Sequence, residues 1–250
     1  MASLGRRLGS GKDADVFEFG EAAIKLYKPG APKHTAFREA AALALAEGLG
    51  LPVPSVGDVR QIDGRWGFVL ARVDGPSFAD VMLKRPTEEA AHVREMASIH
   101  ARIHACEATF FGSLKARLEA NIRRAGIGML QEARRHELLE ELTRLPDGDK
   151  LCHGDFHPWN ILGSLSRPSV VDWTSASRGD PAADVCRSYV LIKPTAPGLS
   201  SSYVQAYAEI AHQSPQDIFK WLPVVAAARL AEGVPDEVDG LMAMSAAPPP

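Results

Sequence analysis

The chain has 250 residues, of which 46% are hydrophobic and 24% charged, and its formal net charge is -3. This composition is typical of a globular protein. The small negative net charge gives no electrostatic reason to expect nucleic acid or an anionic membrane surface as a partner. No apolar run approaches the roughly 18 residues of a membrane span, and the N-terminal residues lack the apolar core of a secretory signal.

The first third of the sequence predicts a small sheet and one helix. β-prone runs are broken by Gly20-Glu21, which indicates a hairpin turn. An Ala- and Leu-rich helix follows Pro32 and is stopped by Gly48 and Gly50. The expected strands are 16–19, 23–27, 56–60 and 66–73, and the expected helix is 35–47.

The remainder is predicted to be mostly helical, and Asp74-Gly75-Pro76 is the first candidate for a lobe boundary. Thr87 is the expected N-cap of the first of these helices, and 151–173 indicates a β-hairpin region. The whole pattern predicts an α+β chain. We expect lobes at 1–74 and 75–245, a disordered tail at 246–250, and helices at 88–105, 114–125, 129–145, 182–192, 201–211 and 221–232.

The segment from His153 to Leu162 is the most informative part of the sequence. It has the form H-x-D-x-x-x-x-N of the protein-kinase catalytic loop, with Asp155 and Asn160 at its polar positions. Asp172 follows apolar residues, where that fold keeps its main magnesium ligand. A phosphoryl group in transfer carries dispersed negative charge, so Mg²⁺ with hard oxygen ligands is required, and Asn160 and Asp172 could supply them. Asp155 could then accept or orient the proton of an acceptor hydroxyl.

The residues from Gly9 to Val16 fit G-x-G-x-x-A-x-V, a glycine-rich phosphate loop. Glycines there let backbone N–H groups approach phosphates. Taken alone, the motif is equally a flexible turn. A dinucleotide-binding turn would open a helix, whereas a strand is predicted after Val16, and a P-loop would need Ser or Thr where Asp13 stands.

Lys25 closes Ala22-Ala23-Ile24-Lys25 on a predicted strand, and Glu39 lies on the next predicted helix. Each alone is an ordinary strand lysine or helix carboxylate. Together they are the ion pair that holds a kinase lysine against the nucleotide phosphates. The order of glycine-rich loop, Lys25, Glu39, catalytic loop and Asp172 is what favours a kinase.

On these motifs the chain resembles the aminoglycoside phosphotransferase and choline-kinase-like family, which has the bilobal protein-kinase-like fold. The resemblance covers nearly the whole chain, and its most specific part runs from His153 to Asp184. It implies a small antiparallel-sheet N-lobe and a larger, mostly helical C-lobe. It also implies that Asp184 ties the catalytic loop to the following helix, and that His100 and His104 pack beneath the active site.

The resemblance implies a role for each candidate residue. Asp155 is the catalytic base, Asn160 and Asp172 are the Mg²⁺ ligands, and Lys25 with its partner Glu39 clamps the phosphates. The implied nucleotide-binding residues besides Lys25 and Glu39 are Gly9, Ser10 and Gly11 at the phosphates, Val16 over the adenine face, and the backbone of Ala71 and Val73 at the adenine edge.

The resemblance also implies an ATP-dependent small-molecule kinase that uses Mg²⁺, with GTP left open as donor. Asp172 precedes Trp173 rather than Phe-Gly, and no long activation loop separates Asp172 from Asp180, which favours a small acceptor with a hydroxyl group over a peptide. The acidic residues Glu232, Asp236, Glu237 and Asp239 would suit a cationic acceptor, aminoglycoside-like or an amino-alcohol, and equally a solvated turn. We expect a monomer or weak homodimer.

Three sparse cysteines without C-x-x-C spacing, Cys106, Cys152 and Cys186, favour reduced thiols in a cytoplasmic protein.

Three rival functions stay open. A kinase-like binding or regulatory module would have lost catalysis. A metal-dependent hydrolase would use His153, Asp155 and His157, or His100 and His104. A nucleic-acid binder would use arginines between 117 and 135, but glutamates interleave with them, which is typical of a solvated helix face.

Overall fold

The computed structural model describes residues 3–126 and 128–246. The chain divides into two compact units, each built from two stretches of sequence. Unit 1 comprises Met1–Pro86 and Pro158–Thr174, and unit 2 comprises Thr87–His157 and Ser175–Pro250. No helix within the described ranges is both long and apolar enough to cross a membrane.

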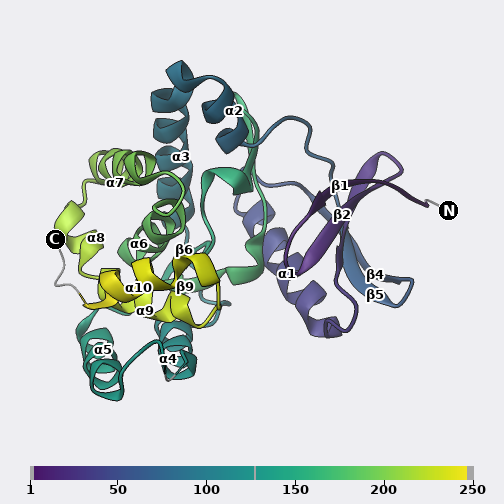
Figure 1. Cartoon of the computed structure of the whole chain (residues 1–250). Helices are drawn as coiled ribbons and strands as arrows, with labels where there is room; N and C mark the ends of the chain where they lie inside the picture. The colour runs from purple at the N-terminus through teal and green to yellow at the C-terminus, as the bar shows by residue number, and fades with distance from the viewer. Residues whose placement is uncertain (1–2, 127, 247–250) are drawn as a thin grey trace. The chain divides into compact units, whose positions relative to one another are not determined.

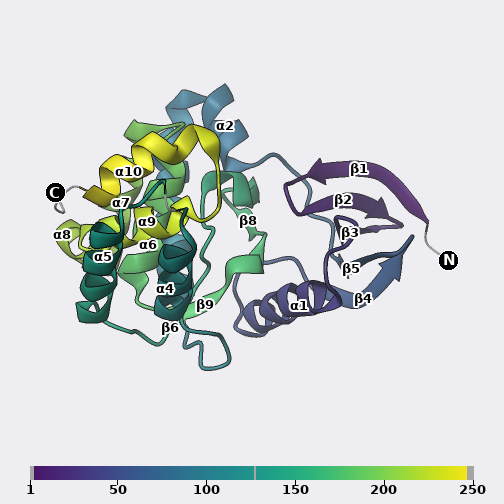
Figure 2. The ribbon, with the colours of Figure 1, turned by 60° about the horizontal axis from the view of Figure 1, so that its bottom comes forward.

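Unit 1 contains a sheet of five antiparallel strands in the order β1-β2-β3-β5-β4 (Figures 1 and 2). Ile24 and Leu26 of one strand pack with Phe19 in an apolar cluster. Because side chains alternate across a strand, Lys25 between them is directed to the opposite face. The strands are β1 (Leu4–Ser10), β2 (Ala14–Phe19), β3 (Ala22–Tyr27), β4 (Val56–Ile62) and β5 (Arg65–Leu70).

Helix α1 (Lys33–Gly48) packs against β4 and β5 on the face to which Lys25 is directed. Phe37 of the helix contacts Trp66 of β5, with ring centroids 6.3 Å apart. The helix ends where Gly50 adopts a φ of 71°, and the N–H of Gly50 donates to the carbonyl of Glu47 at 2.9 Å. Such a left-handed residue after a helix closes its last turn, and glycine adopts it without a Cβ penalty.

The second stretch of unit 1 is a hairpin of β7 (Ile161–Ser164) and β8 (Arg167–Val170), preceded by the 3₁₀ turn η2 (Pro158–Asn160). Two backbone hydrogen bonds join it to the first stretch: Gly163 donates to Pro76 at 3.0 Å, and Val170 donates to Pro52 at 2.7 Å. The short helix α2 (Phe78–Lys84) contacts both η2 and β7.

Unit 2 is mostly helical and has a two-stranded sheet of β6 (Lys150–Cys152) and β9 (Ser177–Gly179). Residues 222–228 of helix α9 are apolar and buried, as expected for a helix surrounded by others. Helices α4, α5, α6 and α10 pack against it, while α3 packs against α7 (Figure 1). The helices are α3 (Glu89–His104), α4 (Leu114–Arg124), α5 (Glu132–Arg144), α6 (Pro181–Ile192), α7 (Pro197–Ala211), α8 (Pro215–Phe219), α9 (Leu222–Leu230) and α10 (Val238–Ala246).

Several local predictions differ from the structure. Thr87 does not cap α3, because Pro86 opens a 3₁₀ turn (Pro86–Glu88) and Glu88 takes the N-cap position. The helix α2 was not predicted, although Ser77 and Asp80 form a capping box at its start. Ala246 ends α10, so the expected tail begins no earlier than 247, and 247–250 lie outside the described residues. The lobes expected at 1–74 and 75–245 stay a prediction beside the compact units.

Candidate active site

In unit 1, Lys25 and Glu39 form the expected ion pair. The Nζ of Lys25 lies 2.7 Å from Oε1 of Glu39. The hydroxyl of Tyr27 donates to the second carboxylate oxygen of Glu39. The residue Glu39 is 2% exposed, and a carboxylate so deeply buried is strongly destabilising unless a cation and hydrogen bonds compensate it. Strand β3 and helix α1 thus fix the lysine through a partner that is itself fixed.

The same lysine also contacts Asp172, whose Oδ1 lies 3.2 Å from Nζ. Burial by itself lowers the pKa of Lys25, but the charges of Glu39 and Asp172 outweigh it and leave the pKa above its ordinary value. Lys25 is therefore a cation at neutral pH. Residues distant in sequence, on β3, on α1 and after β8, meet at this point within unit 1.

The backbone of Asp172 adopts a φ of 64°, a left-handed conformation that is uncommon for any residue other than glycine. The Oγ1 of Thr174 donates to Oδ1 of Asp172 at 2.8 Å. The Asp172 side chain is 41% exposed, whereas that of Lys25 is 13% exposed. The turn after β8 therefore presents a carboxylate toward solvent beside a held ammonium group.

Asn160 reaches the same region through the β7–β8 hairpin. The N–H of Val171 donates to the carbonyl of Asn160 at 3.0 Å, which continues the pairing of Ile161 with Val170. The two expected metal ligands, Asn160 and Asp172, therefore come from opposite sides of one hairpin base. Carboxylate and amide oxygens are the hard donors that Mg²⁺ takes in proteins, so this donor set fits that ion.

The glycine-rich segment begins at the end of β1. In the strand register Gly9 lies opposite Val16, Val16 lies opposite Lys25, and Lys25 lies opposite Phe68. Residues opposite one another share a face, so Val16 and Lys25 are directed to the same side of the sheet. The N–H of Gly11 donates to the carbonyl of Ala14 at 2.8 Å and closes the turn.

Ser10 is held by a residue that the motif did not single out. Its Oγ donates to Oδ1 of Asp15 at 2.7 Å, and the same buried carboxylate binds Lys28 at 2.6 Å and Arg65 at 2.7 Å. Hydrogen bonds from Lys28, Ser10 and Arg65 hold the pKa of Asp15 well below its usual range. Asp15 thereby ties the glycine-rich turn to Lys28, just after β3, and to Arg65 of β5.

The expected adenine-contacting residues lie after β5, where residues 71–74 have no regular secondary structure. The N–H of Ala71 donates to the carbonyl of Ser55 at 2.8 Å. That amide is therefore engaged within the protein, and an adenine contact by Ala71 would have to use its carbonyl.

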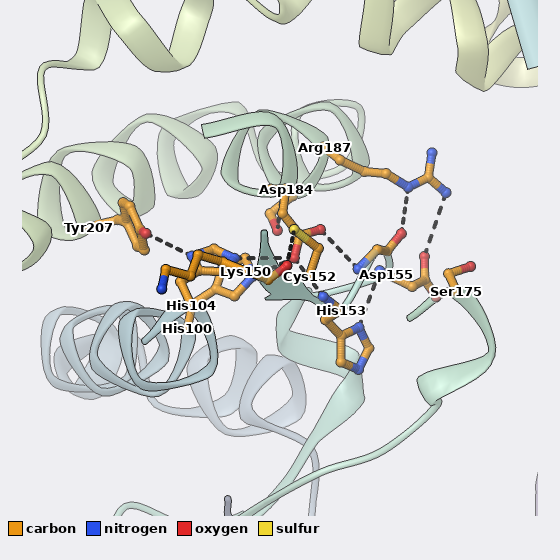
Figure 3. A network of polar contacts seen from close by, with 12 residues as sticks. His100, His104, Lys150, Cys152, His153, Asp155, Ser175, Asp184, Arg187 and Tyr207 are labelled. Carbon is orange, nitrogen blue, oxygen red and sulfur yellow. Dashed lines mark hydrogen bonds and ion pairs between the residues drawn. The ribbon is translucent and has the colours of Figure 1, made fainter. Parts of the chain in front are cut away.

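In unit 2, Asp155 lies beside Arg187 (Figure 3) and His157. Its Oδ1 lies 4.0 Å from Nη2 of Arg187, and its Oδ2 lies 3.6 Å from Nε2 of His157. Burial raises the pKa of Asp155, but the hydrogen bond and charge of His157 and the charge of Arg187 lower it further, so the pKa lies below its ordinary value. The expected base is an ionised carboxylate.

Asp184 holds the backbone that precedes Asp155. The N–H of His153 donates to its Oδ2 at 2.6 Å, and the N–H of Gly154 donates to its Oδ1 at 2.8 Å. Asp184 is on the first turn of α6 and is 1% exposed. The predicted tie between the catalytic loop and the following helix is confirmed.

His100 and His104 complete the surroundings of Asp184. Their Nε2 atoms lie 3.0 Å and 3.3 Å from Oδ2 of Asp184, and their Nδ1 atoms face the hydroxyls of Tyr203 and Tyr207. Burial lowers the pKa of His100 to about 3, so its ring is neutral. A neutral imidazole has one N–H for the carboxylate and one acceptor for the phenol. The ligand atoms are close enough for a metal, within 4.8 Å of one another, but this bonding pattern favours a hydrogen-bonded core network.

The arginines expected on a solvated face divide into two groups. Arg123 pairs with Glu119 at 2.8 Å, and Arg134 pairs with Glu141 at 2.9 Å, as the alternating charges predict. Arg135, by contrast, is 8% exposed and donates to the carbonyl of Ala125 at 3.0 Å. Arg117 donates to the carbonyl of Ser175, and burial lowers its pKa to about 10. The solvated-face prediction is therefore wrong for Arg117 and Arg135.

The acidic residues near the end of the chain are also more engaged than predicted. Glu232 lies 2.8 Å from Nη2 of Arg187 and also contacts Arg229. Glu237 lies 2.8 Å from Nε of Arg229. These two carboxylates are compensated by arginines, so they do not form the acidic patch expected for a cationic acceptor.

Residues 5–218 match the sequence profile of the phosphotransferase enzyme family. The chain belongs to this family. No curated protein matches the chain significantly in sequence. The predicted family resemblance is confirmed at the level of the family, and the solved structures that resemble the chain include aminoglycoside phosphotransferases.

Three of these structures illustrate the likeness of this phosphotransferase-family chain. A thermostable mutant of APH(4)-Ia in ternary complex with AMP-PNP and hygromycin B is 17% identical, with a TM-score of 0.67, covering 98% of this chain and 96% of its own. APH(3'')-Id from Streptomyces rimosus in complex with ADP and streptomycin is 19% identical, with a TM-score of 0.65, covering 87% and 90%. A type VIII aminoglycoside-3'-phosphotransferase is 19% identical, with a TM-score of 0.65, covering 92% and 93%. The predicted α+β, bilobal protein-kinase-like fold is thereby confirmed.

Proposed function

We propose that this chain transfers the γ-phosphoryl group of ATP to a hydroxyl group of a small molecule in a Mg²⁺-dependent, in-line reaction. The observation that carries the proposal is the convergence of Glu39, Lys25 and Asp172. Nζ of Lys25 lies 2.7 Å from one carboxylate and 3.2 Å from the other. A lysine held in this way between a helix glutamate and a metal-binding aspartate is the arrangement that phosphoryl transfer by kinases requires.

Each candidate residue has a stated task. Lys25 neutralises the nucleotide phosphates, and the backbone N–H groups of Gly9, Ser10 and Gly11 place them. Mg²⁺, when bound by Asn160 and Asp172, supplies positive charge to the phosphate oxygens. The carbonyl of Ala71 and the N–H of Val73 contact the adenine edge, and Val16 covers its face. The Ala71 carbonyl is chosen because its N–H already donates to Ser55.

Asp155 orients the acceptor hydroxyl and accepts its proton. Its carboxylate is ionised because His157 and Arg187 compensate its burial. Transfer of this kind relies on positioning and on electrostatic stabilisation more than on covalent chemistry by the protein. Such positioning requires a fixed, ionised carboxylate. Asp155 stands three residues before Pro158 and five before Asn160.

The acceptor is a small molecule with at least one hydroxyl group. Only a short stretch with the turn η3 (Trp173–Ser175) and β9 separates Asp172 from Asp180, which gives a peptide substrate little to bind. An aminoglycoside-like or amino-alcohol acceptor is supported by the family and by the ligands named for the compared structures. Glu232 and Glu237 do not add support, since arginines already bind them. GTP as an alternative donor, a monomeric or weakly dimeric state and a cytoplasmic location stay predictions.

The test begins with thermal unfolding in the presence of ATP, with and without Mg²⁺, followed by ADP release with aminoglycosides, amino-alcohols, homoserine and sugars. Ligand at about 100 times its dissociation constant stabilises a protein by roughly 2.7 kcal/mol, which for a chain of this size raises Tm by several degrees. The Asp155→Asn variant should keep the Mg²⁺-dependent shift and lose ADP release. Absence of a shift with either ATP or GTP, or near-normal turnover by Asp155→Asn, would contradict the proposal.

A further inference from the structure

Arg187 contacts both the backbone and the side chain of the catalytic loop. Its Nε donates to the carbonyl of Gly154 at 2.5 Å, and its Nη2 lies 4.0 Å from Oδ1 of Asp155 (Figure 3). The residue is 8% exposed. No sequence motif marked it, because an arginine in the middle of a helix is normally a surface residue.

Asp184 and Arg187 both bind the peptide units around Gly154. They lie on the same face of α6, since residues three apart on a helix are neighbours. Asp184 accepts from the Gly154 N–H at 2.8 Å, and Arg187 donates to the Gly154 carbonyl at 2.5 Å. Gly154 has a φ of 78°, and a Cβ there would lie 2.4 Å from the carbonyl oxygen of Ser175. The backbone just before Asp155 is therefore held by hydrogen bonds on both sides of Gly154, and a residue larger than glycine does not fit at this position.

Glu232 fixes the guanidinium of Arg187 through the Nη2 atom. Its Oε1 lies 2.8 Å from Nη2 of Arg187. Arg229 of α9 contacts Glu232 in turn and binds Glu237 at 2.8 Å. A buried arginine with a carboxylate and a carbonyl as partners has little rotamer freedom left, so the Nη2 atom that binds Glu232 is also held facing Asp155.

The distance between Arg187 and Asp155 is informative. The 4.0 Å between Nη2 of Arg187 and Oδ1 of Asp155 exceeds the roughly 2.7–3.2 Å of an ordinary N–H···O hydrogen bond. Arg187 therefore acts on the carboxylate mainly through its charge. The charged or titratable groups around Asp155 are His153 and His157 on its own loop, Arg187 on α6, Arg229 near the end of α9, and, beyond Arg187, Glu232 just after α9.

We propose that Arg187 is a positioning residue for phosphoryl transfer: it locks the Gly154 peptide and orients the Asp155 carboxylate toward the acceptor, and Glu232 holds Arg187 in place for this task. The inference rests on the proposed function and deepens it. It also links the base to the segment after α9, so a change near Glu232 reaches the reaction through Arg187.

The experiment compares Arg187→Gln, Arg187→Lys and Glu232→Gln in ADP release with the best acceptor of the screen, or with water if none is found. We expect kcat to fall by at least about tenfold in Arg187→Gln, less than the roughly 10²-fold or more contributed by an acid–base group itself, because Arg187 acts through Asp155. The KM for ATP should change by less than about twofold, because the nucleotide contacts are proposed for unit 1 residues. Arg187→Lys should recover part of kcat.

A double-variant cycle and a matched control complete the test. Glu232→Gln should lower kcat in the wild-type background and have little further effect in Arg187→Gln, because neighbours in one network are not additive. Arg134→Gln is the control, since Arg134 also binds a backbone carbonyl, that of Ser245 at 2.7 Å, and two glutamates. It should leave kcat unchanged.

The outcomes separate the two proposals. An unchanged kcat in Arg187→Gln, or equal losses in Arg187→Lys and Arg187→Gln that follow Tm, would overturn the positioning role while the proposed function stands. If Arg187→Gln fails to fold, Glu232→Gln decides, and an unchanged kcat there would overturn the role. A folded wild-type chain that binds ATP and releases no ADP would overturn the proposed function and this inference with it.

Discussion

Glu39 holds Lys25 with an oxygen–nitrogen distance of 2.7 Å, and both side chains are largely withdrawn from water, at 3% and 13% exposure. Tyr27 occupies the second oxygen of Glu39. The pair therefore orients Lys25 and is also a charge balance within the fold. Removing one member leaves the other buried without its main partner.

We predict that Lys25→Met lowers the free energy of unfolding by about 3 kcal/mol, as is usual when one partner of a buried ion pair is removed. Urea unfolding measures this. The double variant Lys25→Met, Glu39→Leu should regain most of the loss, since an apolar pair needs no charge balance. Lys220→Met, which removes an ion pair whose lysine is 60% exposed, is the control and should have almost no effect. A loss no larger than that of the control would contradict the prediction.

Asp172 should govern the response to Mg²⁺. With Asp172→Asn we expect the Mg²⁺-dependent part of the ATP-induced rise in Tm to disappear, because an amide binds a hard cation more weakly than a carboxylate does. Thermal unfolding with ATP at increasing Mg²⁺ measures it. Asp58→Asn, on exposed β4 and paired with Arg60, is the matched control. A normal Mg²⁺ dependence in Asp172→Asn would remove this residue from its proposed role.

His100 should make the fold sensitive to acid. Burial holds its pKa at about 3, whereas its ordinary value is 6.5. Between these values the unfolded chain binds a proton that the folded chain does not. The contribution to stability is thus complete above pH 6.5 and is lost as the pH falls toward 3, at up to about 1.4 kcal/mol per pH unit.

The measurement is the free energy of unfolding of wild type and His100→Gln at several pH values below neutrality. The variant should be less stable near neutrality and show a shallower loss in acid. His136→Gln is the control, because the His136 side chain is 76% exposed. Parallel pH profiles for wild type and His100→Gln would show that the neutral imidazole is not the cause.

Gly154→Ala should be destabilising for steric reasons. A Cβ there would lie 2.4 Å from the Ser175 carbonyl oxygen and 2.7 Å from Nη2 of Arg117, at a φ of 78°. Strain of this kind costs about 1–3 kcal/mol, and the displaced loop carries Asp155, so we expect Tm and turnover to fall together. Gly198→Ala, where no atom lies within 4 Å of the added Cβ, should leave both unchanged. An unaltered Tm in Gly154→Ala would mean that the loop adapts.

The prediction from sequence was strongest where local pattern and chemical order agree. Alternation located Lys25 on a strand, and a helix stopped by glycines located Glu39, so their pairing could be expected before any coordinates. The α2 helix was missed because a seven-residue segment shows too little periodicity, although its capping box was present in the sequence. Local pattern therefore identifies long elements and ordered motifs better than short ones.

Arg187, Arg117 and Asp15 illustrate what pattern could not supply. Each is charged in a segment whose sequence is compatible with exposure, and each is drawn inward by partners far along the chain, such as Glu232, Ser175 and Arg65. Contacts of this kind depend on tertiary packing, which a hydrophobic period does not encode. The hydrogen bond from the Ala71 N–H to the Ser55 carbonyl could not be predicted from sequence for the same reason.

Residues 158–174 belong to unit 1 although they follow much of unit 2 in the sequence, and this matters for the design of shorter fragments. A fragment truncated after Pro86 would keep the five-stranded sheet but lose Asp172, and the carbonyls of Pro52 and Pro76 would lose their donors from the hairpin. Excision of residues 1–86 as a contiguous piece would therefore leave out Asn160 and Asp172, the proposed metal ligands. A minimal recombinant version needs residues 158–174 grafted behind residue 86 through a designed linker.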